Sequence, residues 1–291
     1  MRLCRHGATH PIGACALQTD MTLLLSGLRI AFIVYVVAVV ALYVFQDRLL
    51  LPPAPTVTDI RLGRHADYDV QSWYPRGRYA GYVITPAGRQ PIGTFLVYHG
   101  NAESAENKQS LAEVFVRFGY RVVLVEYPGH GRRQGTRTMK AALAASRSAL
   151  SDARAQWAES IFLVGESLGA GMAAQSIRGE ESAVAGVLLV TPWDSLESVA
   201  AEKLRLFPVR WILHAPFDTV DALKHYAGQV VVVGCELDTL IPVWHAERLA
   251  HLHPHVQFLL LPGAGHNDWF GSMTADHWRE VFRWLQVAPA Q

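Results

Sequence analysis

The stretch 161–174 constrains the fold of this chain more than any other part of the sequence. It begins with the apolar run Ile161–Val164, continues as Gly165-Glu166-Ser167-Leu168-Gly169, and ends in small residues with helical character. This order predicts a buried strand, a sharp turn and a helix. Glycines suit a turn whose central serine has a strained backbone and little room beside it. Because the helix directs the positive end of its dipole at Ser167, that serine is our candidate nucleophile.

A serine hydroxyl needs a general base, and the base needs an acid that orients it. The apolar runs 229–234 and 256–261 predict two further buried strands. Asp238 follows the first run, and His266 lies on a glycine-rich loop after the second. Residues just beyond the C-terminal ends of parallel strands meet at one edge of a sheet. We therefore expect Ser167, Asp238 and His266 to cluster there, with Glu236 as an alternative acid.

An oxyanion hole is the fourth part that such chemistry requires. The run Gly93–Tyr98 predicts a strand, which ends in His99-Gly100-Asn101-Ala102-Glu103. The hole is expected to use two backbone N–H groups, one from the residue after the nucleophile and one from this earlier loop. Our candidates are the N–H groups of Leu168 and Asn101.

Several motifs now resemble one known family. They are Tyr98-His99-Gly100-Asn101-Ala102, Glu126-Tyr127-Pro128-Gly129-His130-Gly131, Gly165–Gly169, Thr191–Leu196, Asp238–Pro242 and Gly265–Asp268. Over roughly residues 65–287 the chain is similar to α/β-hydrolase-fold proteins, in the branch described as serine aminopeptidase-like or lysophospholipase-like. The resemblance implies the chain order Ser, Asp, His, and it favours Asp238 over Glu236 because Asp-x-x-Ile-Pro matches the family pattern. The serine also argues against the dehalogenases and epoxide hydrolases of this fold, which use an aspartate nucleophile.

The pattern of the remaining elements fits this fold. Strands alternating with helices predict a mostly parallel, eight-stranded sheet covered by helices on both faces, with the first two strands antiparallel. The hydrolase domain is expected over 65–288, and the long connection 192–228 is expected to form a small lid. The expected strands are 68–74, 79–84, 93–98, 121–126, 160–165, 186–191, 229–234 and 256–261, and the expected helices are 106–118, 138–157, 168–178, 242–252 and 274–286.

The N-terminal part has a different composition. Residues 21–46 are largely apolar and predict a transmembrane helix, preceded by a disordered leader over 1–20 and followed by a connector over 47–64. If translation starts at Met21, the leader is an extension outside the true protein. A cleaved signal peptide is the rival interpretation, although small residues suited to a cleavage site are hard to find near Tyr43. The basic residues before the apolar core predict that the N-terminus lies in the cytoplasm and the domain on the extracytoplasmic side.

Composition excludes some partners and leaves others open. A net charge of +1 with scattered basic residues gives no indication of nucleic-acid binding. Three cysteines do not make a disulfide framework, and Cys235 reads as a small buried residue. The partners expected are a small-molecule or lipid acyl substrate and, through the N-terminal helix, a membrane; the oligomeric state stays open.

The sequence therefore predicts a serine hydrolase that acts on ester, thioester or amide bonds, with no need for a metal or an organic cofactor. Trp193, Trp269 and Glu103 are candidates for the substrate pocket. A peptidase releasing N-terminal residues is an alternative, and it would need Glu103 or Asp194 to hold the substrate's α-ammonium group. A membrane-anchored binding protein without turnover is the other alternative, because a fold does not fix a function.

Overall fold

The computed structural model describes residues 12–54, 60–215, 217–253 and 255–286. The chain divides into two units, Met1–Phe45 and Gln46–Gln291, and each is described by itself. The first unit consists of most of helix α1 (Ile12–Leu50), which begins within the segment expected to be a leader. The part Leu23–Leu50 holds an 18-residue window with a mean hydropathy of 2.5, none of it buried. Its length and composition suit a membrane span, and also a signal sequence.

The second unit is built on one mixed sheet. Its described residues form nine strands in the order β1-β2-β3-β5-β4-β6-β7-β8-β9. All pairings from β5 to β9 are parallel, whereas β1, β2, β3 and β5 pair antiparallel. The mostly parallel sheet is thus confirmed, and the short β1 is a strand that the sequence did not predict. The strands are β1 (Gly63–Arg64), β2 (Tyr68–Trp73), β3 (Gly81–Pro86), β4 (Thr94–Tyr98), β5 (Arg121–Val125), β6 (Ile161–Glu166), β7 (Gly186–Val190), β8 (Gln229–Cys235) and β9 (Val256–Leu261).

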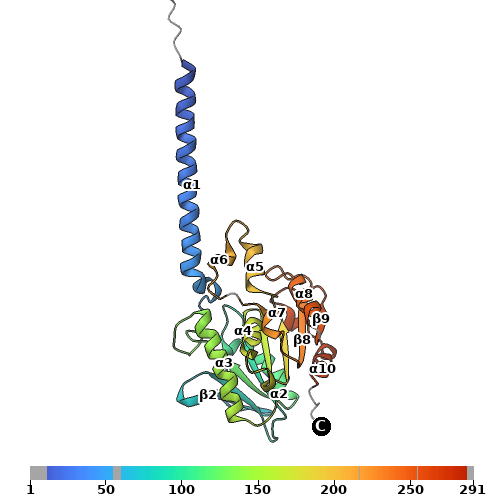
Figure 1. Ribbon diagram of the computed structural model, residues 1–291. Helices are drawn as coiled ribbons and strands as arrows, with labels where there is room; N and C mark the ends of the chain where they lie inside the picture. Colours follow the sequence, from blue (N-terminus) through green and yellow to red (C-terminus); the bar gives the residue numbers. More distant parts are fainter. Residues whose placement is uncertain (1–11, 55–59, 216, 254, 287–291) are drawn as a thin grey trace, which may run out of the picture. The chain divides into compact units, whose positions relative to one another are not determined.

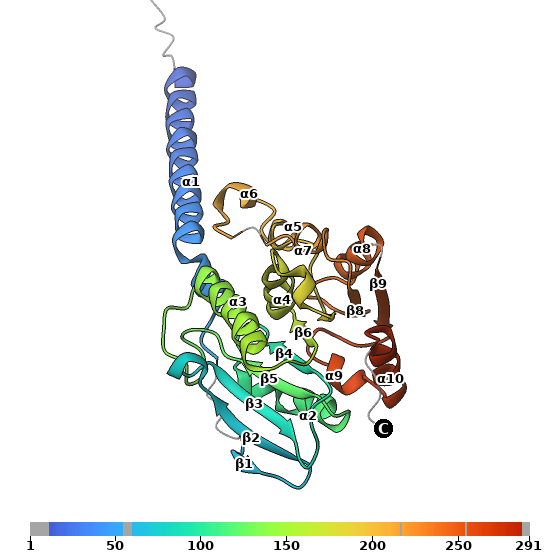
Figure 2. The same cartoon turned by 60° about the horizontal axis from the view of Figure 1, so that its bottom comes forward.

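Helices cover both faces of this sheet (Figures 1 and 2). Strand β4 explains why, because all five of its residues are buried. Leu96 and Tyr98 face a core cluster shared with α3 and α4, while Phe95 and Val97 face a second cluster shared with α2 and α10. The helices after α1 are α2 (Gln109–Arg117), α3 (Met139–Gln156), α4 (Leu168–Ile177), α5 (Leu196–Lys203), α6 (Val209–Ile212), α7 (Thr219–Leu223), α8 (Trp244–Leu252), α9 (Trp269–Ser272) and α10 (Ala275–Trp284), with 3-10 turns η1 (Pro75–Gly77), η2 (Ala105–Lys108) and η3 (Glu181–Ala183).

The strand order reverses direction next to β4. Strand β5 lies on one side of β4. Strand β6 follows β5 in the chain but lies on the other side of β4. Ligand sites in open α/β sheets lie outside the carboxyl ends of the strands at such a reversal. The loop after β4 and the turn after β6 therefore meet at the position where a site is expected.

The excursion between β7 and β8 contains α5, α6 and α7. An isolated bridge between Ser195 and Asp218 closes its base. Leu196 and Phe217, next to this bridge, are buried in the core cluster of α3 and α4. The far end of the excursion is exposed and partly apolar, with Leu206 82% and Trp211 79% exposed. Helix α7 instead packs on the body, where Gln175 of α4 donates a hydrogen bond to the Asp218 carbonyl at 2.9 Å.

The last residues of α1 belong to the second unit. The Gln46 side chain donates to the Ile212 carbonyl and accepts from the His214 N–H, both at 2.7 Å. Asp47 accepts a hydrogen bond from the Met139 N–H at the start of α3, at 2.8 Å. Leu51 is 1% exposed and lies in the cluster of α3 and α4. Residues 46–51 are therefore part of the packed domain, although the sequence suggested a connector from residue 47.

Cys235, at the end of β8, is also a core residue. It is 1% exposed and packs within the cluster of α2 and α10. Burial raises the pKa of its thiol to about 12. Because the thiolate is the reactive form, the described structure gives this cysteine no nucleophilic role.

Candidate active site

Ser167 lies at the turn between β6 and α4 and has a strained backbone. Its φ of 53° and ψ of −115° are rare for a residue with a side chain. The flanking glycines make this turn possible: a Cβ at Gly165 would lie 2.1 Å from the Gly169 carbonyl oxygen, and a Cβ at Gly169 would lie 2.0 Å from that of Tyr98. The Ser167 N–H donates to the Val190 carbonyl at 2.9 Å. The close approach of β4, β6 and α4 therefore holds the serine in its conformation.

Three of the sequence-predicted residues lie in hydrogen-bond contact. His266 Nε2 is 3.0 Å from Ser167 Oγ, and His266 Nδ1 is 2.6 Å from Asp238 Oδ2. The other Asp238 oxygen, Oδ1, accepts from the N–H groups of Leu240 and Ile241 at 2.9 and 2.8 Å. Since a carboxylate accepts, Nδ1 is the donor and carries the proton. The lone pair of Nε2 is then available to the serine hydroxyl, which is the arrangement that a general base requires.

The structure separates the two candidate acids. Glu236 is exposed, and its carboxylate accepts a hydrogen bond from the Gly263 N–H at 2.8 Å. The carboxylate that contacts His266 is that of Asp238, which is 6% exposed. Asp268 accepts from the Gly265 N–H at 3.0 Å and so supports the loop that carries His266.

The two proposed oxyanion donors have amides without a hydrogen-bond acceptor among the described residues. Leu168 is the first residue of α4, where a helix leaves its N–H groups unpaired. Asn101 is exposed in the loop after β4, and the next residue, Ala102, has a φ of 54°. An oxyanion hole requires N–H groups that are free to donate to the substrate, so both residues stay candidates for it.

A charged cluster that the sequence did not predict lies beside this loop. Lys108 Nζ contacts Glu103 Oε1 at 2.8 Å and Glu166 Oε2 at 2.6 Å. The second oxygen of Glu103 accepts from the Gly100 N–H at 2.8 Å. Burial lowers the pKa of Lys108, but the attraction of Glu166 and Glu103 outweighs it, so that the net pKa is raised and the lysine is charged. The only hint in the sequence was the charged Glu166 between a buried strand and the nucleophile.

The loop is held from its other side by His99 and Glu126, both buried. His99 Nδ1 donates to the Gly100 carbonyl at 2.9 Å, and Nε2 is 3.1 Å from Glu126 Oε1. The second Glu126 oxygen accepts from the Ala105 N–H at 3.2 Å, and Tyr127 OH donates to the His99 carbonyl at 3.0 Å. His99 thus supports the loop backbone.

The two tryptophans expected in the substrate pocket are core residues. Trp193 is 5% exposed and packs so closely on Gly171 of α4 that a Cβ there would lie 2.6 Å from its ring. Trp269 is 3% exposed and makes edge contacts with Phe270 and Trp278. Their assignment to a substrate pocket stays a prediction.

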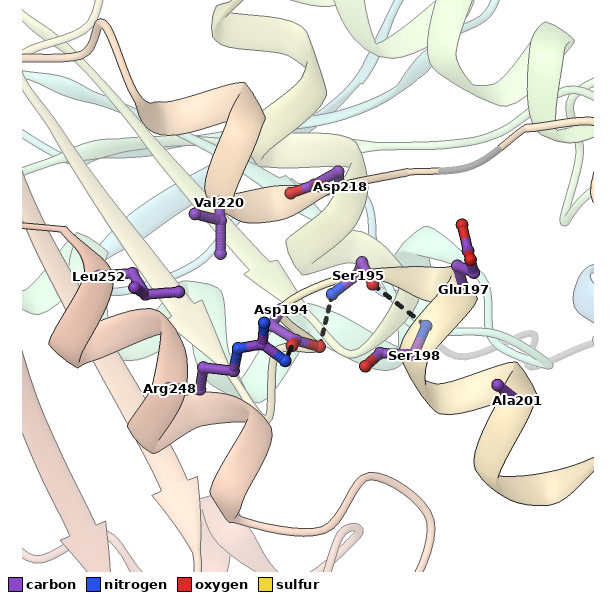
Figure 3. A pocket seen from close by; sticks show the side chains of 9 residues that line it. All are labelled: Asp194, Ser195, Glu197, Ser198, Ala201, Asp218, Val220, Arg248 and Leu252. Atoms are coloured by element: carbon purple, nitrogen blue, oxygen red, sulfur yellow. Dashed lines mark hydrogen bonds and ion pairs between the residues drawn. The ribbon is translucent and has the colours of Figure 1, made fainter. Parts of the chain in front are cut away.

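A cavity of about 390 Å³ lies at the base of the loop between β7 and β8, and Figure 3 shows the Arg248 guanidinium directed at Asp194. Arg248 contacts Asp194 Oδ2 at 3.1 Å, while Oδ1 accepts from His245 Nδ1 at 2.7 Å and from the Ser195 N–H at 2.6 Å. Burial acts to raise the pKa of Asp194, but these partners outweigh it and the pKa is lowered. Asp194 is thus a charged group whose partners are already in place. The cavity is lined by Asp194, Ser195, Glu197, Ser198, Ala201, Asp218, Val220, Arg248 and Leu252.

Comparisons with known proteins bear on the fold and on the class of protein. Residues 89–227 match the profile of the family described as serine aminopeptidase, S33; the match includes Ser167 and ends before Asp238. An uncharacterized protein of Mycobacterium tuberculosis strain H37Rv is 28% identical over 222 residues, which are 74% of this chain and 77% of that protein.

Solved structures are similar in fold at lower sequence identity. An esterase from Pyrococcus furiosus has a TM-score of 0.61 at 16% identity, with 82% of this chain and 99% of that chain covered. An α/β serine hydrolase homologue from Coxiella burnetii has a TM-score of 0.52 at 17% identity, with 77% and 98% covered. The chain therefore has the α/β-hydrolase fold. Together with the profile match, these likenesses support a hydrolase of the serine-hydrolase type.

Proposed function

We propose that this protein is a serine hydrolase that transfers the acyl group of an ester, thioester or amide to water. The observation that carries the proposal is the chain of contacts from Ser167 Oγ to His266, at 3.0 Å, and from His266 to Asp238, at 2.6 Å. Such a relay activates a hydroxyl that is otherwise a weak nucleophile at neutral pH.

The reaction has two halves. Ser167 Oγ attacks the carbonyl carbon while His266 Nε2 takes its proton, and the oxyanion that forms is stabilised by the N–H groups of Leu168 and Asn101. Asp238 holds the imidazole ring and stabilises its positive charge. His266 then gives the proton to the leaving group, and the acyl group stays on the serine. In the second half, His266 takes a proton from water while the water attacks the acyl-serine; the acyl–Oγ bond then breaks, His266 returns the proton to Ser167 Oγ, and the free acid leaves.

The nucleophile is tested with a fluorophosphonate probe and p-nitrophenyl butyrate. Wild-type protein should bind one probe per chain, and Ser167→Ala should bind none and lose about 10⁴- to 10⁶-fold in turnover, as in comparable enzymes. Circular dichroism checks that the variant is folded. Substantial turnover in a folded Ser167→Ala protein would refute the mechanism, and a wild-type protein that neither binds the probe nor hydrolyses esters would favour the alternative of a binding protein without turnover.

A peptidase that releases N-terminal residues is the second candidate, and the description of the matching family favours it. Such an enzyme needs a carboxylate to hold the substrate's α-ammonium group. Glu103 already contacts Lys108, and Asp194 already contacts Arg248. These pairings favour ester substrates. Comparing kcat/KM for p-nitrophenyl esters and aminoacyl p-nitroanilides distinguishes the two functions. A higher kcat/KM for the anilides would favour the peptidase over the esterase.

We also propose that α1 anchors the enzyme in a membrane as a single span, with the domain on the extracytoplasmic side. The support is the apolar segment Leu23–Leu50 and the basic residues before its uncharged core. An anchored site is held close to a lipid surface. Lipid-derived or membrane-associated acyl groups then become the favoured substrate class.

A further inference from the structure

The Glu103–Lys108–Glu166 cluster links the two loops that carry the proposed oxyanion donors. Glu103 belongs to the loop of Asn101, and Glu166 directly precedes Ser167 and Leu168 in the chain. The Lys108 side chain is 7% exposed and joins the two carboxylates, whose side chains are 28% and 10% exposed. A single ammonium group therefore connects the loop after β4 to the turn after β6.

The cluster and His99 together hold the backbone that carries the Asn101 N–H group. Gly100 is held at both of its backbone groups, because its N–H donates to Glu103 at 2.8 Å and its carbonyl accepts from His99 at 2.9 Å. The Gly100 carbonyl and the Asn101 N–H belong to the same planar peptide unit and point in opposite directions. Fixing the carbonyl therefore fixes the direction of the Asn101 N–H.

The Leu168 N–H is fixed in a similar way. It shares a peptide unit with the Ser167 carbonyl, which accepts from the Ala170 N–H at 3.0 Å. The spacing between the two peptide units is set at the strand ends, where Tyr98 of β4 pairs with Gly165 of β6. Beyond the strand ends Lys108 bridges the two loops, at 2.8 Å from one carboxylate and 2.6 Å from the other.

Stability alone is a weak explanation for such a cluster. Two carboxylates and one ammonium group leave a net negative charge in a largely buried position, and burying charges is costly. Apolar residues of similar size often stabilise a protein as well as a buried ion pair does. What the charged cluster adds is a defined geometry, since Lys108 can satisfy both carboxylates only at one separation of the two loops.

We propose that Lys108 is a positioning residue that sets the spacing of the Asn101 and Leu168 N–H groups through Glu103 and Glu166. This inference rests on the proposed serine-hydrolase function. Oxyanion donors act mainly on the transition state, so a change in their spacing lowers kcat and leaves KM almost unchanged. Losing one donor outright costs about 10²- to 10³-fold in kcat, and a misplaced donor should cost less.

The main test removes all three charges together, so that none is left buried without a partner. The variant Glu103→Gln/Lys108→Met/Glu166→Gln should lower kcat for p-nitrophenyl butyrate by about 10- to 100-fold, with KM within about twofold of wild type. It should still bind one fluorophosphonate per chain, at a reduced rate, because Ser167, His266 and Asp238 are unchanged. If the wild type binds one probe per chain, the proposed function stands, and an unchanged kcat in the triple variant then counts against this inference alone. If the wild type binds no probe, the proposed function itself has failed.

Two further variants make the test specific. Lys108→Arg keeps a cation that can contact both carboxylates, so it should retain more kcat than Lys108→Met. Lys224→Met is the matched control, because it removes an exposed lysine that contacts Asp221 at 2.7 Å, and its kcat should equal that of wild type.

If the triple variant does not fold, Glu103→Ala gives the answer. Glu103 is the most exposed member of the cluster, and its loss frees both Gly100 and Lys108. We expect a fall in kcat of about tenfold at constant KM. A folded triple variant or Glu103→Ala with wild-type kcat, or one in which only KM changes, would overturn the inference.

Discussion

The replacement Asp238→Asn tests how the structure fixes the proton on His266. Asp238 Oδ1 accepts two backbone hydrogen bonds, from Leu240 and Ile241, while Oδ2 accepts from His266 Nδ1. An asparagine has one acceptor and one donor end. If its oxygen keeps the two backbone bonds, its NH₂ group faces Nδ1, and the imidazole must then carry its proton on Nε2. In that tautomer Nε2 cannot accept the serine proton.

The expected loss of kcat follows from the cost of the other orientation of the asparagine amide. Turning the amide to restore the correct tautomer removes the acceptor of two backbone N–H groups, at about 1–3 kcal/mol each. The total of roughly 2–6 kcal/mol corresponds to about a 30-fold to 10⁴-fold lower population of the active form. The lost negative charge adds to this, because it no longer stabilises the imidazolium. We therefore expect kcat to fall by about 10³- to 10⁴-fold.

The assay is the steady-state hydrolysis of p-nitrophenyl butyrate at neutral pH, with circular dichroism to check folding. Glu236→Gln is the matched control, since Glu236 lies two residues away and its exposed carboxylate accepts from the Gly263 N–H instead of contacting His266. Its kcat should stay within about threefold of wild type, as is usual for exposed substitutions. The reasoning is refuted if Asp238→Asn keeps more than about a tenth of the activity, or if Glu236→Gln is the more damaging change.

Three further predictions concern the stability of the domain and its attachment to a membrane. Burial, with a smaller contribution from the nearby His99, lowers the pKa of His130 to about 4. Below about pH 6.5 His130 binds a proton in the unfolded chain but stays neutral in the folded chain. The free energy of unfolding should therefore fall as the pH drops from about 6.5 to 4. In urea titrations at both ends of this range, His130→Asn should show a smaller fall than wild type; equal slopes would contradict the assignment. The full-length chain should stay with membranes in high salt, and the fragment 46–291 should be soluble and active. The fragment 52–291 should melt at a lower temperature, because it lacks the contacts of Gln46, Asp47 and Leu51; equal melting temperatures would show that these contacts contribute nothing.

Much of the fold could be predicted because its central strands are continuous apolar runs. The run 229–234 and the observed β8 differ by one residue, and 256–261 coincides with β9. Strand β8 is buried almost throughout, as expected inside a parallel sheet, whereas β9 lies at the edge and leaves Gln257 and Leu260 exposed, so the expectation of a buried strand over 256–261 was wrong. The order of the strands along the chain fixes which loops share an edge. Short elements were missed because they hold too few residues to form a recognisable pattern. Strand β1 has two residues and α9 has four, too few for a periodic pattern.

The candidate site could be predicted in part. Ser167, Asp238 and His266 follow strand ends, so their meeting is a consequence of topology. Lys108 could not be predicted, because its role depends on a contact with Glu166, 58 positions away, that no local pattern records. The sequence also could not show that the Glu103 carboxylate, assigned to the substrate pocket, contacts Lys108 and the Gly100 N–H.

The separation of the site residues along the chain also determines when activity can first arise. The Ser167–His266 contact spans 99 positions, and His266 follows β9, which lies at the edge of the sheet. A chain that has left the ribosome only as far as α8 carries the nucleophile without its base. Domains fold as units during synthesis, and closing so long a loop requires the intervening strands to dock first. If the proposed function holds, the growing chain cannot cleave acyl groups until β9 is in place, and the onset of activity then follows the docking of that strand.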